Sequence, residues 1–97
     1  MIVTFKNQGT EDTFYGKNTK NARKACPTLL WRKARIKLDQ LDSASDYIDI
    51  KVPPGNRLKS LKGARLGQSS IRINDQYRIC FVWSESGPMN VEITDYH

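Results

Sequence analysis

Apolar residues recur at helical spacing in the first half of the chain. Four of them follow one another at intervals of four, four and three positions: Leu30, Ala34, Leu38 and Leu41. This spacing places them on one face of a helix, so the pattern predicts a helix over residues 28–44, directly after Pro27. An earlier start near Asn21 with an interruption at Pro27 is the alternative, because proline breaks a helix interior.

The residues before this helix predict two shorter elements. The stretch IVTF at 2–5 is rich in residues that favour β-structure, and it predicts a short edge strand. The stretch QGTEDTFYGKN at 8–18 predicts a short helix that ends near Gly16, with Thr10 as its N-cap.

The second half of the chain has the short β-rich runs and turn residues of a meander. The pattern predicts four strands, at 58–63, 69–74, 76–83 and 89–96. The second and third are expected to form a hairpin, because Asn74 and Asp75 lie between them. Residues 51–58 are expected to form a turn or loop, since they contain two prolines and a glycine, and 85–88 form the next turn.

Strand parity sorts the side chains of this meander. Alternate residues of the central strand are apolar and point one way: Tyr77, Ile79, Phe81 and Trp83. Arg78 points the other way, and Arg72 is expected to share its face. The apolar face is expected to receive the helices. The order of elements therefore predicts an α+β domain, with two N-terminal helices packed on one face of a small, mainly antiparallel sheet.

Length and composition limit the class of protein. A chain of 97 residues is expected to form one domain, 1–97. No apolar run approaches the ~20 residues of a transmembrane helix, and the N-terminal residues lack the layout of a signal peptide. We therefore expect a cytoplasmic protein with no membrane partner. Cys26 and Cys80 form no paired-ligand pattern, so reduced thiols are expected.

Positive charge is concentrated in the middle of the chain. The net charge is +6, and residues 50–74 hold six basic residues and no acidic one. This segment indicates a site for a polyanion. A solvated basic face and an acidic protein partner are the alternatives, but contact with nucleic acid is the favoured interpretation.

Several kinds of site are poorly supported. The stretch LKGARLGQSS lacks the residue order of a nucleotide-binding phosphate loop. One histidine and dispersed cysteines and acids indicate no metal site and no cofactor. A serine could approach His97, the only histidine in the chain, but no GxSxG motif marks a nucleophile.

What remains is phosphoryl transfer on RNA without a metal. The reaction needs a base for the ribose 2′-hydroxyl, an acid for the leaving 5′-oxygen and cations for the scissile phosphate. His97 is suited to the proton transfer, because the unperturbed pKa of histidine is ~6.5. The candidate cations are Lys59, Lys62, Arg65 and Arg78, and arginine can bind two phosphate oxygens at once.

Each of these residues also has an ordinary structural interpretation. Lys59 and Lys62 could be surface lysines, Arg78 could pair with Glu92 across strands, and Asp95 could do the same or cap a turn. A terminal histidine on its own is usually inert. Only the combination of basic segment, strand arginine and terminal histidine argues for a site.

Two stretches resemble a known family. PPGNRLKSLKGARLGQSSIRINDQYRICFVW and the ending VEITDYH are similar to the HigB, or killer-protein, branch of the RelE/ParE toxin superfamily. The resemblance extends over essentially the whole chain. The order of the LKG segment, the strand with an aromatic residue before arginine, and the terminal DYH is its most specific part.

The resemblance implies a RelE-like fold and the toxin of a type II toxin–antitoxin system. Such a toxin is a ribosome-dependent endoribonuclease, an mRNA interferase, which cleaves mRNA in the decoding site of the 70S ribosome and stops translation. It also implies a HigA-type helix-turn-helix antitoxin, through which alone the toxin meets operator DNA.

The resemblance implies site residues one at a time. The catalytic candidates are His97, Tyr96, Asp95, Lys62 and Lys59. The candidates for binding RNA phosphates are Arg57, Arg65, Arg72 and Arg78. Several HigB sequences carry an active-site histidine where this chain has Lys59. Lysine is a poor base at pH 7, because its usual pKa is ~10.4, so His97 is expected to carry the proton transfer.

Two other functions remain open from the sequence. ParE proteins share the fold and poison gyrase without cleaving RNA. A non-catalytic module that binds RNA or the ribosome would need only the basic segment.

Overall fold

The computed structural model describes residues 1–95, except for the side chain of Pro54. Its helices lie in the first part of the chain and its strands in the second, as expected for an α+β protein. The α-helices are α1 (Gln8–Phe14), α2 (Lys20–Ala25), α3 (Trp31–Ser43) and α4 (Tyr47–Lys51). Single 3-10 turns are η1 (Thr28–Leu30), η2 (Pro54–Asn56) and η3 (Gly63–Arg65). The strands are β1 (Lys59–Ser60), β2 (Ser69–Arg72), β3 (Tyr77–Ser84) and β4 (Gly87–Asp95).

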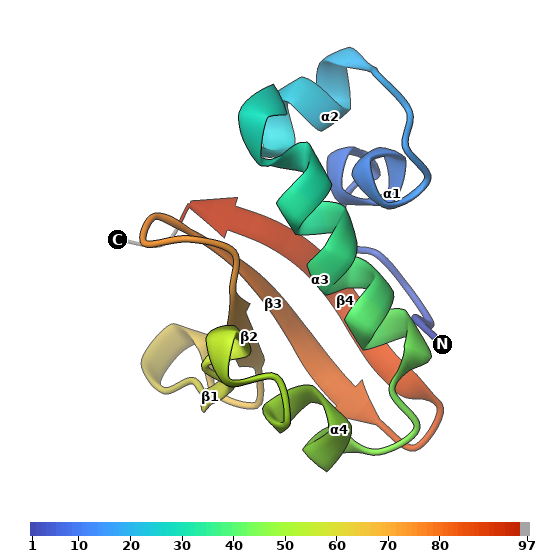
Figure 1. The fold of residues 1–97 in the computed structure, drawn as a ribbon. Coiled ribbons are helices and arrows are strands. Elements are labelled where there is room, and N and C mark those ends of the chain that lie inside the picture. The colour runs from blue at the N-terminus through green and yellow to red at the C-terminus, as the bar shows by residue number, and fades with distance from the viewer. Residues whose placement is uncertain (96–97) are drawn as a thin grey trace.

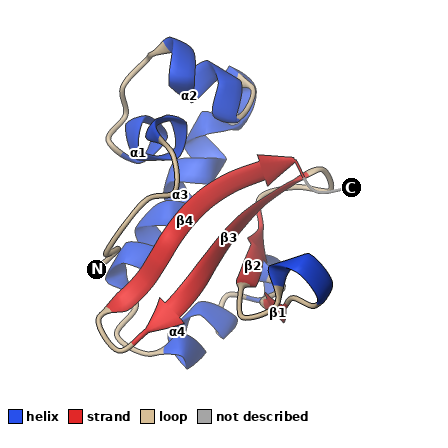
Figure 2. Ribbon diagram, turned by 180° about the vertical axis from the view of Figure 1, so that it is seen from behind, coloured by secondary structure: helices blue, strands red, loops and turns tan. Residues whose placement is uncertain are grey.

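The four strands form one antiparallel meander in the order β1-β2-β3-β4. Helix α3 crosses one face of β3 and β4 (Figure 1). The view from behind shows the other face of these two strands without a covering α-helix (Figure 2). The prediction of an α+β fold with helices on one sheet face is therefore confirmed.

The core lies between α3 and the sheet. Ala34, Leu38 and Leu41 of α3 are fully buried, and they belong to the same cluster as Ile79 and Phe81 of β3. The cluster also includes Ile71, Ile73, Val91 and Ile93. The predicted strand parity is thus confirmed, because the apolar set of β3 faces the helices.

The helical region confirms the break at Pro27. Helix α2 ends at Ala25, and the chain resumes as η1 and then α3. Pro27 lacks an N–H group and cannot continue α2. Trp31 donates from Nε1 to the carbonyl oxygen of Cys26 at 3.1 Å, which fixes the corner between α2 and α3.

The predicted N-cap of α1 is wrong. Asn7 caps this helix, since its side chain accepts a hydrogen bond from the N–H of Thr10 at 2.9 Å. Thr10 lies inside the helix and is buried. Its hydroxyl oxygen accepts from the N–H of Ile93 at 2.9 Å. The hydroxyl of this threonine therefore joins α1 to the outer edge of β4.

The segment 2–5 lies at the sheet edge, as predicted, but it does not form a regular strand. It makes a single parallel bridge, between Phe5 and Val91. Val3 donates to the carbonyl oxygen of Pro88 at 2.8 Å and Lys6 to that of Val91 at 2.9 Å. The first residues thus cover the first part of β4, and α1 covers the next.

Helix α4 was not predicted. Its first turn is held by Asp49, whose carboxylate accepts from the N–H groups of Ser45 and Asp46 at 3.1 and 3.0 Å. This arrangement is a capping box, which satisfies N–H groups that a helix start leaves open. The strand predicted at 58–63 is also shorter than expected, since β1 contains only Lys59 and Ser60.

Candidate nucleic-acid interface

The sheet face opposite the helices gathers basic side chains. Lys59 of β1 lies beside Ser70 of β2, and Arg72 of β2 lies beside Arg78 of β3. The register continues to β4, where Thr94 lies beside Arg78. We call the surface formed by these strand residues together with Lys6, Arg65 and Glu92 the basic sheet face.

Glu92 is the central carboxylate of this face. Its Oε1 lies 2.8 Å from Nη1 of Arg65 and 3.5 Å from Nζ of Lys6. Arg65 also donates to Gln68 at 3.0 Å. The side chain of Glu92 is only 12% exposed. The pairing expected as an alternative for Arg78 is therefore made by Arg65 and Lys6, two residues far from β4 in sequence.

Cys80 lies beside Glu92 in the register and is fully buried under this cluster. Burial raises the pKa of its thiol, and the carboxylate of Glu92 acts in the same direction. The thiol is thus neutral at pH 7 and lines the layer beneath the cations. Both cysteines are free, as expected from the sequence.

Arg72 and Arg78 are held at the turn between β2 and β3. Arg72 forms an ion pair with Asp75 in the turn, and the hydrogen bond from this arginine lowers the pKa of the Asp75 carboxyl. Arg78 donates to the carbonyl oxygens of Asn74 and Tyr77. These contacts keep both guanidinium groups at one end of the face.

Arg57 and Lys59 follow a tightly held turn. Arg57 adopts a left-handed backbone conformation with φ 47° and ψ 53°, which is uncommon for a residue other than glycine. The preceding Asn56 is fully buried and anchors the turn. It accepts from Lys37 of α3 and donates to the carbonyl oxygen of Ile50. The helical layer therefore fixes where the basic segment begins.

Lys37 is more buried than a typical lysine. Burial lowers its pKa, and the charges of Lys33 and Arg72 lower it further. Lys59 and Lys62, in contrast, are exposed. Lys62 directly precedes η3, so it stands at the start of the turn that carries Arg65. Exposed lysines such as Lys59 on the basic sheet face and Lys62 before η3 are suited to contact a polyanion.

Asp95 lies away from the basic sheet face. It is the register partner of Tyr77, whose strand parity points to the helix side. Its carboxylate accepts a hydrogen bond from Gln76 at 3.0 Å. Tyr96 and His97, the other two residues of the terminal triplet, lie outside the described residues. The structure thus brings together Lys59, Arg65, Arg72 and Arg78 and separates Asp95 from them.

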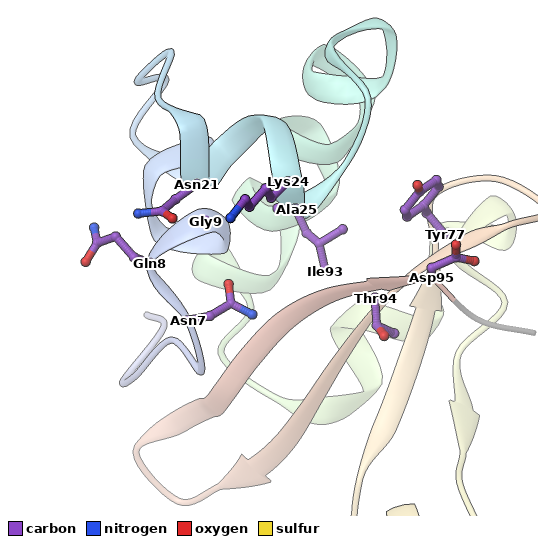
Figure 3. A pocket seen from close by; sticks show the side chains of 10 residues that line it. All are labelled: Asn7, Gln8, Gly9, Asn21, Lys24, Ala25, Tyr77, Ile93, Thr94 and Asp95. Atoms are coloured by element: carbon purple, nitrogen blue, oxygen red, sulfur yellow. The ribbon is translucent and has the colours of Figure 1, made fainter.

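A pocket of about 390 Å³ opens between the helix pair α1–α2 and the strand ends (Figure 3). Ten residues line it, and seven of them have polar side chains: Asn7, Gln8, Asn21, Lys24, Tyr77, Thr94 and Asp95. The sequence patterns did not predict this pocket. The spacing of Asn21, Lys24 and Ala25 along α2 was the available signal, because positions three and four apart share a helix face.

The described residues contain no group of three or more histidines, cysteines or acids that could hold a metal ion. Within the same part of the chain, no helix is long and apolar enough to span a bilayer. What the basic sheet face offers is cations, which can bind phosphates and stabilise charge on their oxygens.

Comparisons with known proteins agree with this architecture. Residues 3–97 match a family described as the RelE-like toxin HigB of type II toxin–antitoxin systems. The chain is 34% identical over 90 residues to Toxin HigB-1 of Vibrio cholerae, covering 93% of this chain and 92% of that protein. It is also 31% identical over 71 residues to an uncharacterized protein of Haemophilus influenzae, covering 73% and 69% of the two chains. Fold and sequence together show that the chain belongs to the HigB-like family of RelE-like toxins.

Proposed function

We propose that this toxin is a ribosome-dependent endoribonuclease that cleaves mRNA in the decoding site and so inhibits translation. The observation that supports this function best is the basic sheet face. Lys59, Arg72 and Arg78 lie on the side of the sheet that the four α-helices leave uncovered. A single-stranded polyanion can reach this side without displacing a helix.

In this proposal the chemistry needs no metal. His97 takes the proton from the 2′-hydroxyl as this oxygen attacks the phosphorus, because its usual pKa is near neutral. The ammonium group of Lys59 gives a proton to the 5′-oxygen as the P–O5′ bond breaks. Lys59 and Lys62 bind the scissile phosphate, with Tyr96 beside it. Arg57, Arg65, Arg72 and Arg78 hold the flanking phosphates and stabilise the charge that develops on their oxygens.

Asp95 acts indirectly in this mechanism. Its carboxylate contacts Gln76 and belongs to the helix side of the sheet. It therefore fixes the end of β4, from which the chain continues to Tyr96 and His97. This role makes Asp95 a positioning residue, and the proton transfers are left to His97 and Lys59.

The partners follow from the same proposal. The substrate is mRNA on the 70S ribosome, and the neutralising partner is a HigA-type helix-turn-helix antitoxin. Operator DNA is reached only through that antitoxin.

The test is to map the 5′ ends of transcripts in growing cells with and without induction of the toxin. New ends within translated codons are expected, and they should disappear in the His97→Ala variant while antitoxin binding survives. Arg32→Ala on α3 serves as the matched control, because it removes an exposed charge from the helix side.

Other outcomes would contradict the proposal. DNA breaks without new mRNA ends would identify a gyrase poison. Ribosome binding that is sensitive to salt but produces no new ends would identify a non-catalytic module. Full toxicity of the His97→Ala variant would remove the role given to the histidine.

A further inference from the structure

The pocket beside β4 adjoins the basic sheet face through two residues. Thr94 lines the pocket and is also the register partner of Arg78 on the basic sheet face. Asn7, another lining residue, follows Lys6, whose amine lies 3.5 Å from Glu92. A strand of RNA that lies on the basic face can therefore turn around the edge of β4 and enter the pocket.

This edge of the sheet is accessible because the covering segment ends before it. The first residues pair with β4 only as far as the bridge between Phe5 and Val91. The N–H of Ile93 is then satisfied by the hydroxyl of Thr10. Beyond that point Thr94 and Asp95 line the pocket rather than another strand.

Three side chains of the pocket have polar groups available to a ligand, those of Asn7, Asn21 and Lys24. Neither Asn21 nor Lys24 makes a side-chain hydrogen bond or ion pair with any residue in the range 1–95, and both are exposed. Asn7 uses its side-chain oxygen to cap α1, which leaves its amide N–H₂ to donate. Amide groups of this kind can hydrogen-bond the edge of a nucleobase.

Tyr77 and Lys24 add the other two features that bind a nucleotide. Tyr77 is half-buried at the start of β3 and lies on the strand side of the pocket (Figure 3). An aromatic ring gives a base a surface to stack on. Lys24 lies on the helix side, where its amine can bind a phosphate. The volume of about 390 Å³ is within the usual range of small-ligand pockets, ~300–1,000 Å³.

The close packing of α1 on α2 sets the shape of this wall. A Cβ atom at Gly9 would lie 2.4 Å from the backbone carbonyl oxygen of Asn21. Since a backbone atom cannot give way as a flexible side chain can, only glycine allows the two helices to approach this closely. Asn21 is thereby held directly beside the first turn of α1.

We propose that this pocket holds one unstacked nucleotide of the mRNA, next to the cleaved bond, and sets the sequence preference of cleavage. The inference rests on the proposed ribonuclease function and assigns it a specificity site. Asn7 and Asn21 read the base edge, Tyr77 stacks on the base, and Lys24 binds its phosphate.

The first test compares the positions of mRNA cleavage in variants of three pocket residues, Asn21, Tyr77 and Lys24. Asn21→Ala should redistribute the 5′ ends among codons, by roughly 5-fold or more between favoured and disfavoured sites. Tyr77→Leu should reduce cleavage at favoured sites by roughly 5- to 100-fold, whereas Tyr77→Phe should retain it. Lys20→Ala is the matched control for Lys24→Ala, since it removes the same charge from α2 outside the pocket.

A second test does not depend on cleavage. Adenosine, cytidine, guanosine and uridine monophosphates are titrated into the full-length protein and followed by NMR. Shifts are expected at the side-chain amide of Asn21 and the ring of Tyr77, with different affinities for the four bases. Inorganic phosphate alone should not reproduce them.

The two tests separate the pocket from the wider function. Base-dependent binding without any new mRNA ends would retain the pocket and remove the ribonuclease. An unchanged pattern of cleavage in active Asn21→Ala and Lys24→Ala variants would overturn the nucleotide site. Loss of antitoxin binding alone in those variants would also overturn it and assign the groove to the protein partner.

Discussion

Glu92 sits among cations that are suited to bind phosphate. It pairs with Arg65 at 2.8 Å and with Lys6 at 3.5 Å, and its side chain is mostly shielded from solvent. A carboxylate there holds the two cations in place but would also repel the backbone of the proposed RNA substrate. Its removal should therefore affect binding and turnover in opposite directions.

We expect Glu92→Gln to bind single-stranded RNA several-fold more tightly, because one negative charge leaves the basic sheet face. Cleavage of bound mRNA should slow, since Arg65 loses the charged partner that orients it. Binding is measured by fluorescence anisotropy and turnover by single-turnover cleavage on the ribosome. Weaker binding by this variant would show that Glu92 acts only as a structural support.

Asp12 is a residue whose ionisation contributes to stability. Its carboxylate accepts from the hydroxyl of Thr19 at 2.6 Å and from Gln8 at 2.8 Å. The hydrogen bond from Thr19 is the main cause of its lowered pKa, with that from Gln8 next. Because Thr19 is also the N-cap of α2, this carboxylate joins the first two helices.

Lowering the pH should weaken this contact between α1 and α2. A carboxyl whose pKa is lowered on folding stabilises the fold above its unfolded pKa of ~3.9, and this contribution is lost as the pH falls through the folded value. The free energy of unfolding should therefore decrease with pH below about 4, measured by urea denaturation. Asp12→Asn should flatten this dependence, and Gln8→Ala should flatten it only in part.

At the scale of elements, the turn before β1 depends on a buried polar contact. Asn56 joins α3 to α4 and η2, through hydrogen bonds with Lys37 and with the carbonyl oxygen of Ile50. The same turn places Arg57 in its left-handed conformation. The start of the basic segment is thus determined by the helical layer rather than by the sheet.

Asn56→Ala should destabilise the protein by about 2 kcal/mol or more, since it leaves a buried carbonyl oxygen and a partly buried amine without partners. The free energy of unfolding is obtained from denaturant titration. Asn18→Ala is the control, because Asn18 makes only an exposed contact, with Arg23. An equal loss of unfolding free energy in the two variants would mean that the buried contact of Asn56 stabilises the protein no more than an exposed one.

The elements that the sequence predicted well are those with strong local signals. The hairpin at Asn74 and Asp75 and the apolar face of α3 were both correct, because turn residues and helical spacing act over a few positions. The cap of α1 was wrong because Asn7 and Thr10 are both good capping residues. Only the contact of Thr10 with Ile93, 83 positions away, distinguishes them.

Local signals were weaker for α4 and for the site. Helix α4 has five residues, too few for a periodic pattern to be recognised. The charge pattern identified the basic segment but could not pair Arg65 with Glu92, because that contact depends on strand register and on a turn. The pocket depends on how α2 packs on α1, and this packing cannot be predicted from the residues of either helix alone.

For the whole molecule, the two faces of the sheet should respond differently to salt. Exposed Lys59 lies on the basic sheet face, and exposed Lys62 lies directly before η3. Arg32 and Lys33 are also exposed, but they lie on α3, on the helix side of the sheet. Only the first pair is expected to contact RNA phosphates. The number of contacts can be read from the slope of log affinity against log salt concentration.

Replacing both Lys59 and Lys62 by alanine should reduce that slope by roughly 1.4, because each phosphate contact contributes ~0.7 on a single strand. Replacing Arg32 and Lys33 removes the same charge and should change the slope little. The measurement is anisotropy of an RNA oligonucleotide over about 50 to 200 mM salt. Equal changes in the two double variants would mean that net charge, rather than the basic sheet face, determines binding.

The pairing of β4 with the first residues of the chain has a consequence for how the toxin is made. Val3, Lys6 and Thr10 all bond to β4, the last described element to be synthesised. The backbone groups of the first residues therefore stay unpaired until β4 has been synthesised. The sheet cannot be completed until β4 has left the ribosome. The toxin domain therefore cannot complete its fold while β4 is still inside the ribosome that is making it.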